Sequence, residues 1–329
     1  MRALVTGATG KVGHAVARAL ADRGDEVVAL VRDPDRAAAV LPEGVRAVGG
    51  DVGDPASVGA AAEGCELAFN AMGLPEQWLA DPEEFMRVNA RGSETVVVEA
   101  ARAGVRRVVH TSTIDVFDAA PGARFDESRV AGYPKGTVYE RSKQEADRLV
   151  LAAADREGVE VVFANPAAVY GPGPQGSASP ERDILRPVVE GRVAAVPALP
   201  PGGFGMLFSD GAAAGHLLAA ERGEPGERYI LCDGHVSLRE LAEIAVGVAG
   251  RGRVPPVMPT PLARALAAAG EPLARLTRKP PLLPKGQLHF LLWNAQPDST
   301  KAQRDLGWQP TPIEDGVRAT LRSMGLLDG

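Results

Sequence analysis

The chain has 329 residues, 45% hydrophobic and 24% charged, a balance that excludes a mostly disordered chain, a collagen-like repeat and a small disulfide scaffold. Its formal net charge of −6 argues against a nucleic acid or a membrane as partner. Two distant cysteines, Cys65 and Cys232, indicate a reducing, cytoplasmic environment without a metal or disulfide framework. No apolar run approaches the ~20 residues that span a bilayer, and a strand expected at residue 2 leaves no room for a signal peptide.

In the first half, short β-branched runs alternate with longer, alanine-rich amphipathic stretches. We expect strands at 2–6, 26–31, 45–48, 67–70, 107–111 and 159–164. Helices are expected at 14–23, in a stretch that ends before Pro42, and at 57–63, 82–103 and 138–156. This alternation predicts an α/β fold with a Rossmann-type, doubly wound parallel sheet. Such sheets bind ligands at the carboxyl ends of their strands.

The composition changes after Asn165. Prolines recur from Pro166 to Pro201 and divide this stretch into loops and short elements, before a helix at 211–222, a strand at 228–231 and a helix at 238–250. We therefore divide the chain into a Rossmann domain at 1–165 and a smaller, discontinuous region at 166–329. Some elements of the second region are expected to return to the main sheet.

A basic segment lies between Arg251 and Phe290. It contains seven Lys or Arg and a single acid, Glu271, so its formal charge is +6. We interpret it as a solvated surface. The functional alternative is a region that draws an anionic substrate towards a cleft.

A glycine-rich segment, TGATGKVG at residues 6–13, separates the first expected strand from the first expected helix. One glycine permits a tight turn, one lets the backbone approach a pyrophosphate, and one lets the helix pack on the strand. The helix amino terminus supplies N–H donors and a partial positive charge. Glycines at this spacing also occur in ordinary turns, but strand, loop and helix stand here in the right order. We predict that 1–165 binds a dinucleotide and 166–329 the substrate.

Tyr139 and Lys143 stand four residues apart on an expected helix, hence on one face. A positive charge beside a tyrosine lowers its pKa from ~10 and makes it a better proton donor and acceptor near neutral pH. The alternative is an ordinary neighbour pair on a surface helix. About 26 residues upstream, the strand at 107–111 leads into Ser112 and Thr113, whose hydroxyls could hydrogen-bond a carbonyl or simply cap the strand.

Together these segments resemble the extended short-chain dehydrogenase/reductase family over nearly the whole chain. The resemblance implies catalytic roles for Tyr139, Lys143 and Thr113, and homodimers are the family habit. It also implies a set of cofactor-binding residues at the strand ends. These are Gly7, Thr9, Gly10, Lys11, Val12, Arg32, Asp51, Val52, Asn70, Ala71, Met72, Lys143, Asn165 and Pro166.

Within the family, residues 31–34, 215–223 and 226–231 resemble the dihydroflavonol-reductase-like members. Sugar-nucleotide epimerases and dehydratases more often carry Arg where this chain has Asn165.

The end of the second strand bears on the choice of cofactor. NAD-binding members of this fold place an acid there, whereas this chain has Val31 followed by Arg32. A guanidinium can bind a 2′-phosphate through bidentate hydrogen bonds, so we predict NADP(H), with NAD(H) as the alternative. Arg32 could also be a solvated strand end, and Asp33 could reach the ribose or cap the next turn.

These observations favour an NAD(P)-dependent oxidoreductase that transfers a hydride between the cofactor and a ketone or secondary alcohol. Tyr139 would exchange the proton, Lys143 would hold the nicotinamide ribose and lower the tyrosine pKa, and Thr113 would orient the carbonyl. One alternative is a nucleotide-sugar epimerase or dehydratase with tightly held NAD; another is a non-catalytic dinucleotide-binding sensor. The residues do not identify the substrate, although the many Gly, Pro, Ala and Leu after Pro174 suggest an apolar small molecule.

Overall fold

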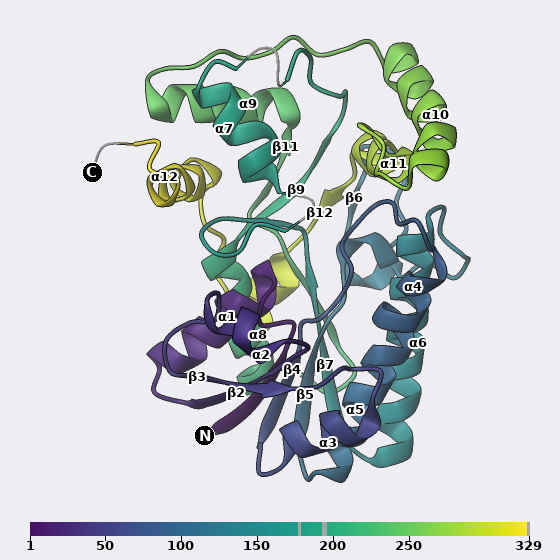
Figure 1. Cartoon of the computed structure of the whole chain (residues 1–329), viewed down its shortest axis with the longest axis vertical. Coiled ribbons are helices and arrows are strands. Elements are labelled where there is room, and N and C mark those ends of the chain that lie inside the picture. The colour runs from purple at the N-terminus through teal and green to yellow at the C-terminus, as the bar shows by residue number, and fades with distance from the viewer. Residues whose placement is uncertain (177–178, 193–195, 328–329) are drawn as a thin grey trace.

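The structure is a computed structural model that describes residues 1–176, 179–192 and 196–327. Its centre is a seven-stranded sheet in which every neighbouring pair is parallel. In spatial order the strands are β10 (Arg228–Leu231), β7 (Glu160–Pro166), β5 (Arg107–Thr111), β4 (Leu67–Asn70), β1 (Arg2–Thr6), β2 (Glu26–Val31) and β3 (Val45–Gly49). The predicted Rossmann-type fold is confirmed (Figure 1).

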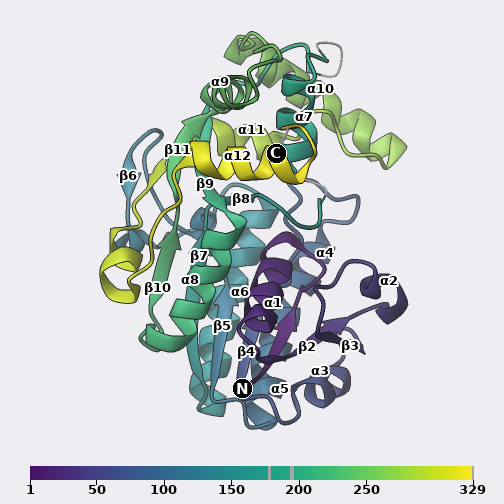
Figure 2. The same ribbon diagram turned by 90° about the vertical axis from the view of Figure 1, so that its left-hand side faces the viewer.

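Helices cover both faces of this sheet (Figure 2). One face carries α1 (Lys11–Asp22), α2 (Pro34–Ala38) and α8 (Ser209–Arg222), and the other carries α3 (Pro55–Ala62), α5 (Ser93–Arg102) and α6 (Val138–Glu157). Both faces are therefore buried, which explains why the strands read as continuous apolar runs. The helix expected at 82–103 is present as α4 (Glu83–Phe85), a π-helical segment (Met86–Gly92) and α5 in succession.

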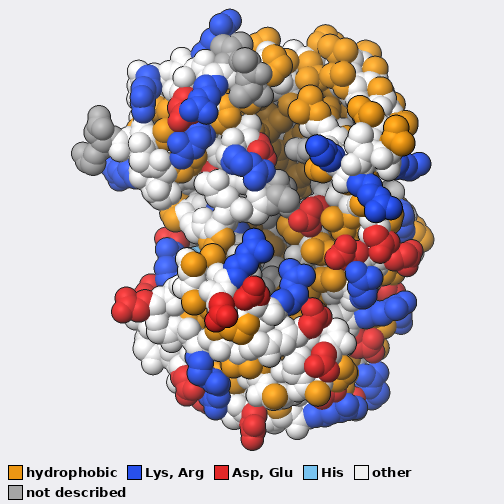
Figure 3. Space-filling view, in the orientation of Figure 1, with side chains coloured by type: hydrophobic (Ala, Val, Ile, Leu, Met, Phe, Trp, Pro, Cys, Tyr) orange, Lys and Arg blue, Asp and Glu red, His pale blue; other side chains and the backbone are white. Residues whose placement is uncertain are grey.

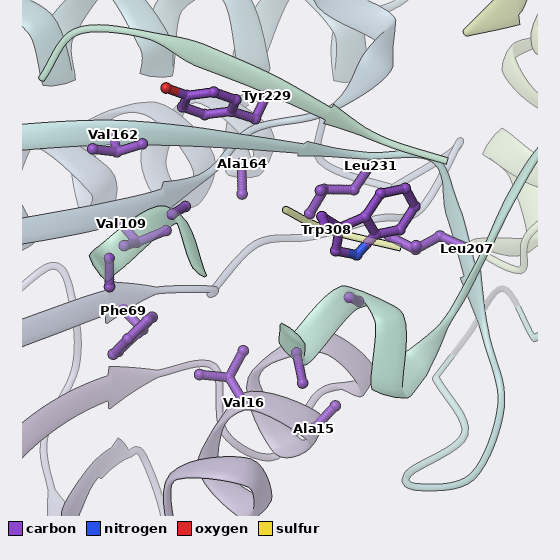
Figure 4. Packing of buried hydrophobic residues seen from close by; sticks show 14 of the residues in the cluster. Ala15, Val16, Phe69, Val109, Val162, Ala164, Leu207, Tyr229, Leu231 and Trp308 are labelled. Atoms are coloured by element: carbon purple, nitrogen blue, oxygen red, sulfur yellow. The ribbon is translucent and has the colours of Figure 1, made fainter. Parts of the chain in front are cut away.

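The core on the α1 and α8 side draws its residues from both halves of the chain (Figure 4). Val16 of α1 and Val109 of β5 pack there with Leu231 of β10 and with Trp308. Trp308 is fully buried, and its indole nitrogen donates to the carbonyl of Gly211 over 2.8 Å.

Three expected helices begin earlier than the sequence pattern indicates, and one of them, expected at 211–222, starts at Ser209. The helix expected at 14–23 starts at Lys11, because the last residues of the glycine loop already form its first turn. The helix expected at 57–63 starts at Pro55, where the Asp54 side chain accepts from the amide of Ala56 and caps the first turn.

The upper part of the molecule holds a three-stranded sheet of β11 (Gly234–Ser237), β9 (Gly203–Phe208) and β8 (Ala168–Tyr170). Three helices pack with it around a second core: α7 (Arg186–Val189), α9 (Leu238–Ala249) and α12 (Ile313–Ser323). Beside them, α10 (Thr260–Thr277) packs against α11 (Lys285–Trp293) around a small apolar cluster. A short pair, β6 (Arg124–Phe125) and β12 (Gln296–Pro297), completes the described strands.

The chain passes between the two parts more than once. After β7 it leaves the main sheet for β8 and β9, and it returns as α8 and β10, which pairs with β7. We keep the division at 165/166 as a proposal, with α8 and β10 as the elements of 166–329 that join the larger unit.

Candidate active site

The glycine loop packs tightly against the chain that follows β4. Gly7 has a φ of 71°, and a Cβ there would lie 2.6 Å from the carbonyl oxygen of Ala71 and 2.7 Å from the Cα of Met72. A Cβ on Gly13 would lie 2.3 Å from the carbonyl oxygen of Gly7. Only glycine fits at these positions. Within the described residues no side chain caps α1 at Gly10, so its first N–H groups are available to an anion.

Lys11 points its side chain away from the loop. Its ammonium lies 2.7 Å from the carbonyl oxygen of Gly171 and 3.0 Å from a carboxylate oxygen of the buried Glu181. A contact between Lys11 and a cofactor would therefore come from its backbone N–H. Thr9 is exposed on the loop and Val12 is half-buried in the first turn.

Arg32 is exposed at the end of β2, and no ion pair involves it among the described residues. Its neighbour Asp33 caps α2 by accepting from the amide of Arg36 over 3.1 Å. The capping role suggested for Asp33 is thus the one observed. Because Thr6 of β1 pairs with Leu30 of β2, Arg32 and the glycine loop emerge from the same edge of the sheet.

Asp51 and Val52 follow β3 at the same edge. The Asp51 carboxylate accepts from the amide of Gly53 over 2.7 Å and so shapes its own turn. The Val52 side chain lies against the backbone of Gly92, at the end of the π-helical segment.

Asn70 points into a buried polar network behind the strand ends. Its amide oxygen accepts from the Thr6 hydroxyl over 2.8 Å, and its amide nitrogen lies 3.0 Å from Nδ1 of His110. Nε2 of His110 lies 3.4 Å from Asp147, which forms an ion pair with Arg228 of β10. Sequence reasoning missed His110, Asp147 and Arg228, since nothing local marks them as partners. They fix the strand ends rather than face the loop.

The surroundings of this network shift the pKa values of both His110 and Asp147. Burial lowers the pKa of His110, so that imidazole is neutral at physiological pH. Burial opposes ionisation of Asp147, but the Arg228 guanidinium and His110 together hold the pKa of its carboxyl at about 2. The result is one internal ion pair between α6 and the edge strand β10.

The three predicted catalytic residues come together where β5 ends beside α6. Thr137 and Glu140 form a capping box that starts α6 at Val138. Tyr139 and Lys143 then lie one turn apart, and the Tyr139 phenol lies near the side chain of Thr113. The Lys143 ammonium donates to the carbonyl oxygen of Thr111 over 2.7 Å.

The expected lowering of the Tyr139 pKa is wrong in this structure. Burial raises the pKa of Tyr139, the negative charge of Asp115 raises it further, and the Thr113 hydrogen bond opposes them. Lys143 is itself buried, which lowers its pKa to about 8. Its charge is directed at the Thr111 carbonyl.

Asp115 is a second buried acid beside this trio, and sequence reasoning missed it. It lies on the turn after Thr113 and is 6% exposed. Its Oδ1 atom has no hydrogen-bond partner among the described residues. Burial, reinforced by the charge of Glu140, raises the pKa of Asp115 to about 7. An aspartate two residues after a candidate catalytic hydroxyl was the available signal.

Asn165 and Pro166 end β7 on the other side of Thr113. The Asn165 amide nitrogen donates to the carbonyl oxygen of Thr113 over 2.8 Å, and its amide oxygen is buried without a partner among the described residues. Asn165 therefore holds the backbone that presents the Thr113 hydroxyl.

The described part of the chain has no cluster of three or more His, Cys, Asp or Glu that could hold a metal ion. It also has no helix that is long and apolar enough to cross a membrane. The strand ends offer instead an uncapped helix amino terminus that suits phosphates, and a neighbouring phenol and hydroxyl that suit proton exchange.

A doubly wound sheet, a glycine loop and a Tyr/Lys/Thr site define an extended short-chain dehydrogenase/reductase. The family model described as "NAD dependent epimerase/dehydratase family" matches residues 3–232. The chain therefore belongs to the NAD-dependent epimerase/dehydratase family, and it is an enzyme of NAD(P)-dependent oxidoreductase type.

Two curated relatives and one solved structure span nearly the whole chain. The chain is 33% identical to "Sterol demethylase protein B" of Methylococcus capsulatus over 94% of each chain. It is 29% identical to "Putative dihydroflavonol 4-reductase" of Synechocystis, over 95% of this chain and 91% of the relative. The crystal structure of gox2253 superposes with a TM-score of 0.78 at 28% identity over 99% of each chain.

Proposed function

We propose that the protein is an NADP(H)-dependent oxidoreductase that interconverts an apolar ketone and the corresponding secondary alcohol. The observation that carries the proposal is that Tyr139 and the side chain of Thr113 meet at the carboxyl end of β5, with Lys143 one turn further along α6. When bound, the nicotinamide supplies or accepts the hydride. The chain's own residues orient the substrate and move the proton.

Tyr139 and Thr113 hold the substrate oxygen between them. The Tyr139 phenol donates the proton to that oxygen during reduction and takes it back during oxidation. Thr113 fixes the direction of the oxygen, and Asn165 fixes Thr113 through its carbonyl. Lys143 is proposed to bind the ribose hydroxyls of the cofactor. A buried ammonium with a pKa of about 8 can also replace the phenolic proton.

The cofactor-binding residues surround the glycine loop. We assign phosphate binding to the backbone of Gly7, Thr9, Gly10, Lys11 and Val12, in line with the uncapped start of α1. Adenine is assigned to the segment of Asp51 and Val52. The nicotinamide side is assigned to residues at the strand ends: Asn70, Ala71, Met72, Asn165 and Pro166. Asn70 would contribute its backbone, because its side chain is hydrogen-bonded to Thr6 and His110.

Arg32 supports NADP(H) rather than NAD(H). Its guanidinium is exposed and carries no ion pair in the described chain, and Asp33 is committed to capping α2. A free guanidinium at the end of β2 suits a 2′-phosphate, whereas a free carboxylate there would repel it.

Two observations support an apolar substrate. One relative is named for a sterol. In addition, aromatic rings of Phe204, Phe290, Trp293 and Phe125 follow one another from β9 through α11 to β6. Figure 3 shows the surface hollowed between the α7–α9 side and the α10–α11 side, with hydrophobic side chains inside the hollow. We propose this hollow as the substrate entrance.

The epimerase or dehydratase alternative has one observation in its favour. The Asp115 carboxylate, with a pKa of about 7, lies beside the Tyr139 phenol and could accept a proton from a carbon next to a carbonyl. Incorporation of solvent deuterium at such a carbon, abolished by Asp115→Asn, would favour this alternative over simple reduction.

The proposal is tested by incubating the protein with NADPH and NADH against steroid ketones, aliphatic ketones and sugar nucleotides, following oxidation of the reduced cofactor. We expect oxidation of NADPH with an apolar ketone only. Turnover of a sugar nucleotide without added cofactor, with NAD retained through purification, would identify an epimerase or dehydratase. Binding of a dinucleotide without turnover of any class would favour a sensor. We also propose that the protein is a homodimer and is located in the cytoplasm.

A further inference from the structure

Helix α10 buries its small side chains and exposes its large apolar ones, the reverse of an ordinary surface helix. The residues that it buries are small: Ala263 and Ala267 pack in the cluster with α11, and Ala274 is buried as well, each at most 2% exposed. Its leucines face outward, with Leu273 61% exposed and Leu276 83% exposed. A surface helix that stabilises a fold normally buries its largest apolar side chains. The exposed leucines of α10 therefore serve something other than the packing of this chain.

These leucines form one continuous surface. Leu262, Leu266, Leu273 and Leu276 recur at helical spacing and share a stripe along α10. Leu282, in the loop before α11, is 98% exposed. We call these five residues the leucine surface. Figure 3 shows hydrophobic side chains gathered over this corner of the molecule, and α10 projects from its edge in both ribbon views. A projecting apolar ridge of this kind marks a binding surface.

The leucine surface is accompanied by unpaired positive charge. Arg264, Arg275, Arg278 and Lys279 are exposed, and none of them has an acidic partner among the described residues. The one acid of the segment, Glu271, is paired with Lys285 at 3.1 Å. The expectation of no membrane partner was drawn from the net charge of the whole chain, but the charge of residues 251–290 has the opposite sign.

We propose that the leucine surface binds an anionic phospholipid bilayer, with α10 lying in the interface and the protein remaining peripheral. Exposed leucines on one side of a helix and Lys or Arg on the others is the pattern of interfacial helices. Each cation close to an anionic leaflet adds attraction that falls off within a Debye length. A convex ridge can sink into a fluid surface without a complementary groove. The same excess of positive charge disfavours contact between two copies of α10.

The neighbours of α10 place this surface beside the candidate active site. α11, on which α10 packs, has its His289 ring against the backbone of Gly136 and 3.8 Å from Glu140 of the α6 capping box. The backbone of Gly286 lies against Gln77, in the loop after β4. A bilayer under α10 would thus lie next to the side from which an apolar substrate is proposed to enter.

The test is co-sedimentation of the full chain with vesicles of phosphatidylcholine alone and with about a third phosphatidylglycerol. We expect binding to the anionic vesicles that weakens as salt is added. Leu273→Ser with Leu276→Ser, and separately Arg278→Glu with Lys279→Glu, should each lower the partition coefficient about tenfold or more. Leu151→Ser, at an exposed leucine of α6, and Arg46→Glu, at an exposed arginine of β3, are matched controls that should bind like the parent chain.

Three results would overturn the proposal. The first is that the parent chain does not bind anionic vesicles. The second is that the α10 variants bind them as well as the two controls do. Alternatively, light scattering would show that the leucine variants lose self-association while vesicle binding is unchanged, which would assign the surface to a second copy of the chain. Circular dichroism verifies that each variant is folded. Because the readout is vesicle binding, the test is independent of the proposed reaction.

Discussion

Tyr139 meets the side chain of Thr113 in an environment that disfavours a free phenolate. Burial and the neighbouring Asp115 both raise the pKa of the phenol, so it is protonated at neutral pH and suited to donate to a developing alkoxide. Lys143, whose ammonium donates to the Thr111 carbonyl, is not among the groups that lower the pKa of the phenol. At the scale of single residues, a protonated phenol is what the proposed reduction of a carbonyl requires.

Replacing the phenol isolates its contribution to turnover. Tyr139→Phe should lower kcat by roughly 10²–10⁴ while the Kd for the cofactor changes little, because the phenol acts chiefly in the transition state. Steady-state kinetics and fluorescence titration with NADPH measure the two quantities. Tyr133→Phe, at an exposed tyrosine bonded to Asp118, is the control. Near-normal turnover by Tyr139→Phe would remove this residue from the mechanism.

Arg32 should decide between the two nicotinamide cofactors. Arg32→Ala should raise the KM for NADPH about tenfold or more, equivalent to ~1.4 kcal/mol, and leave the KM for NADH nearly unchanged. Arg46→Ala, at an exposed arginine near the amino end of β3, should affect neither. Equal losses with both cofactors, or a parent enzyme that prefers NADH, would contradict a contact with the 2′-phosphate.

Asp115 should make the stability of the fold depend on pH. Its pKa is raised from 3.8 to about 7, so between those values the folded state binds more protons than the unfolded state. Stability from this group is therefore lost as pH rises from about 4 to 7. Asp115→Asn should remove that loss and gain roughly 1–4 kcal/mol relative to the parent at pH 8, but little at pH 4. Urea unfolding at both pH values measures it, and an equal effect at both would show that Asp115 is ionised normally.

At the scale of elements, the junction of β1 and α1 depends on the absence of a side chain. Gly13→Ala would force a methyl group to within 2.3 Å of the Gly7 carbonyl oxygen. It should cost roughly 1–3 kcal/mol of stability and weaken dinucleotide binding. Gly247→Ala, on the open side of α9, has no such neighbour and should stabilise the chain by ~0.5–1 kcal/mol. Thermal unfolding and NADPH titration of both variants test the contrast, and similar behaviour would show that the loop tolerates a Cβ.

The elements that the sequence pattern predicts best are the buried parallel strands. Their short apolar runs are rich in β-branched residues, which favours strands, and β1, β2, β4, β5 and β10 begin and end where expected. Helix starts were less well predicted, because α1 begins within the glycine loop and the Asp54 cap sets the start of α3, and neither follows from hydrophobic spacing. In the second half, α10 was not predicted; its leucines do recur at helical spacing, but they face solvent, which the sequence alone does not reveal.

The residues of the candidate site also fall into two groups, those that a local sequence pattern predicts and those that it does not. Local patterns identified the glycine loop and the pair of Tyr139 and Lys143. The burial of Asp115 and the ion pair between Asp147 and Arg228 arise from segments far apart in the chain, so no local pattern encodes them. The direction of the Tyr139 pKa was mispredicted for that reason, since it depends first on burial and then on charges that tertiary packing brings close.

At the scale of the whole molecule, the return of α8 and β10 to the main sheet bears on folding. Four alanines of α8 and the side chains of Tyr229 and Leu231 cover the face formed by Val109, Val162 and Ala164 (Figure 4). A fragment ending at Asn165 would leave this face bare and β7 as an open edge. Such a fragment should aggregate, and the intact chain should melt in one cooperative transition by calorimetry. The substrate-side half would then be as necessary to the folding of the nucleotide-binding half as it is to the reaction.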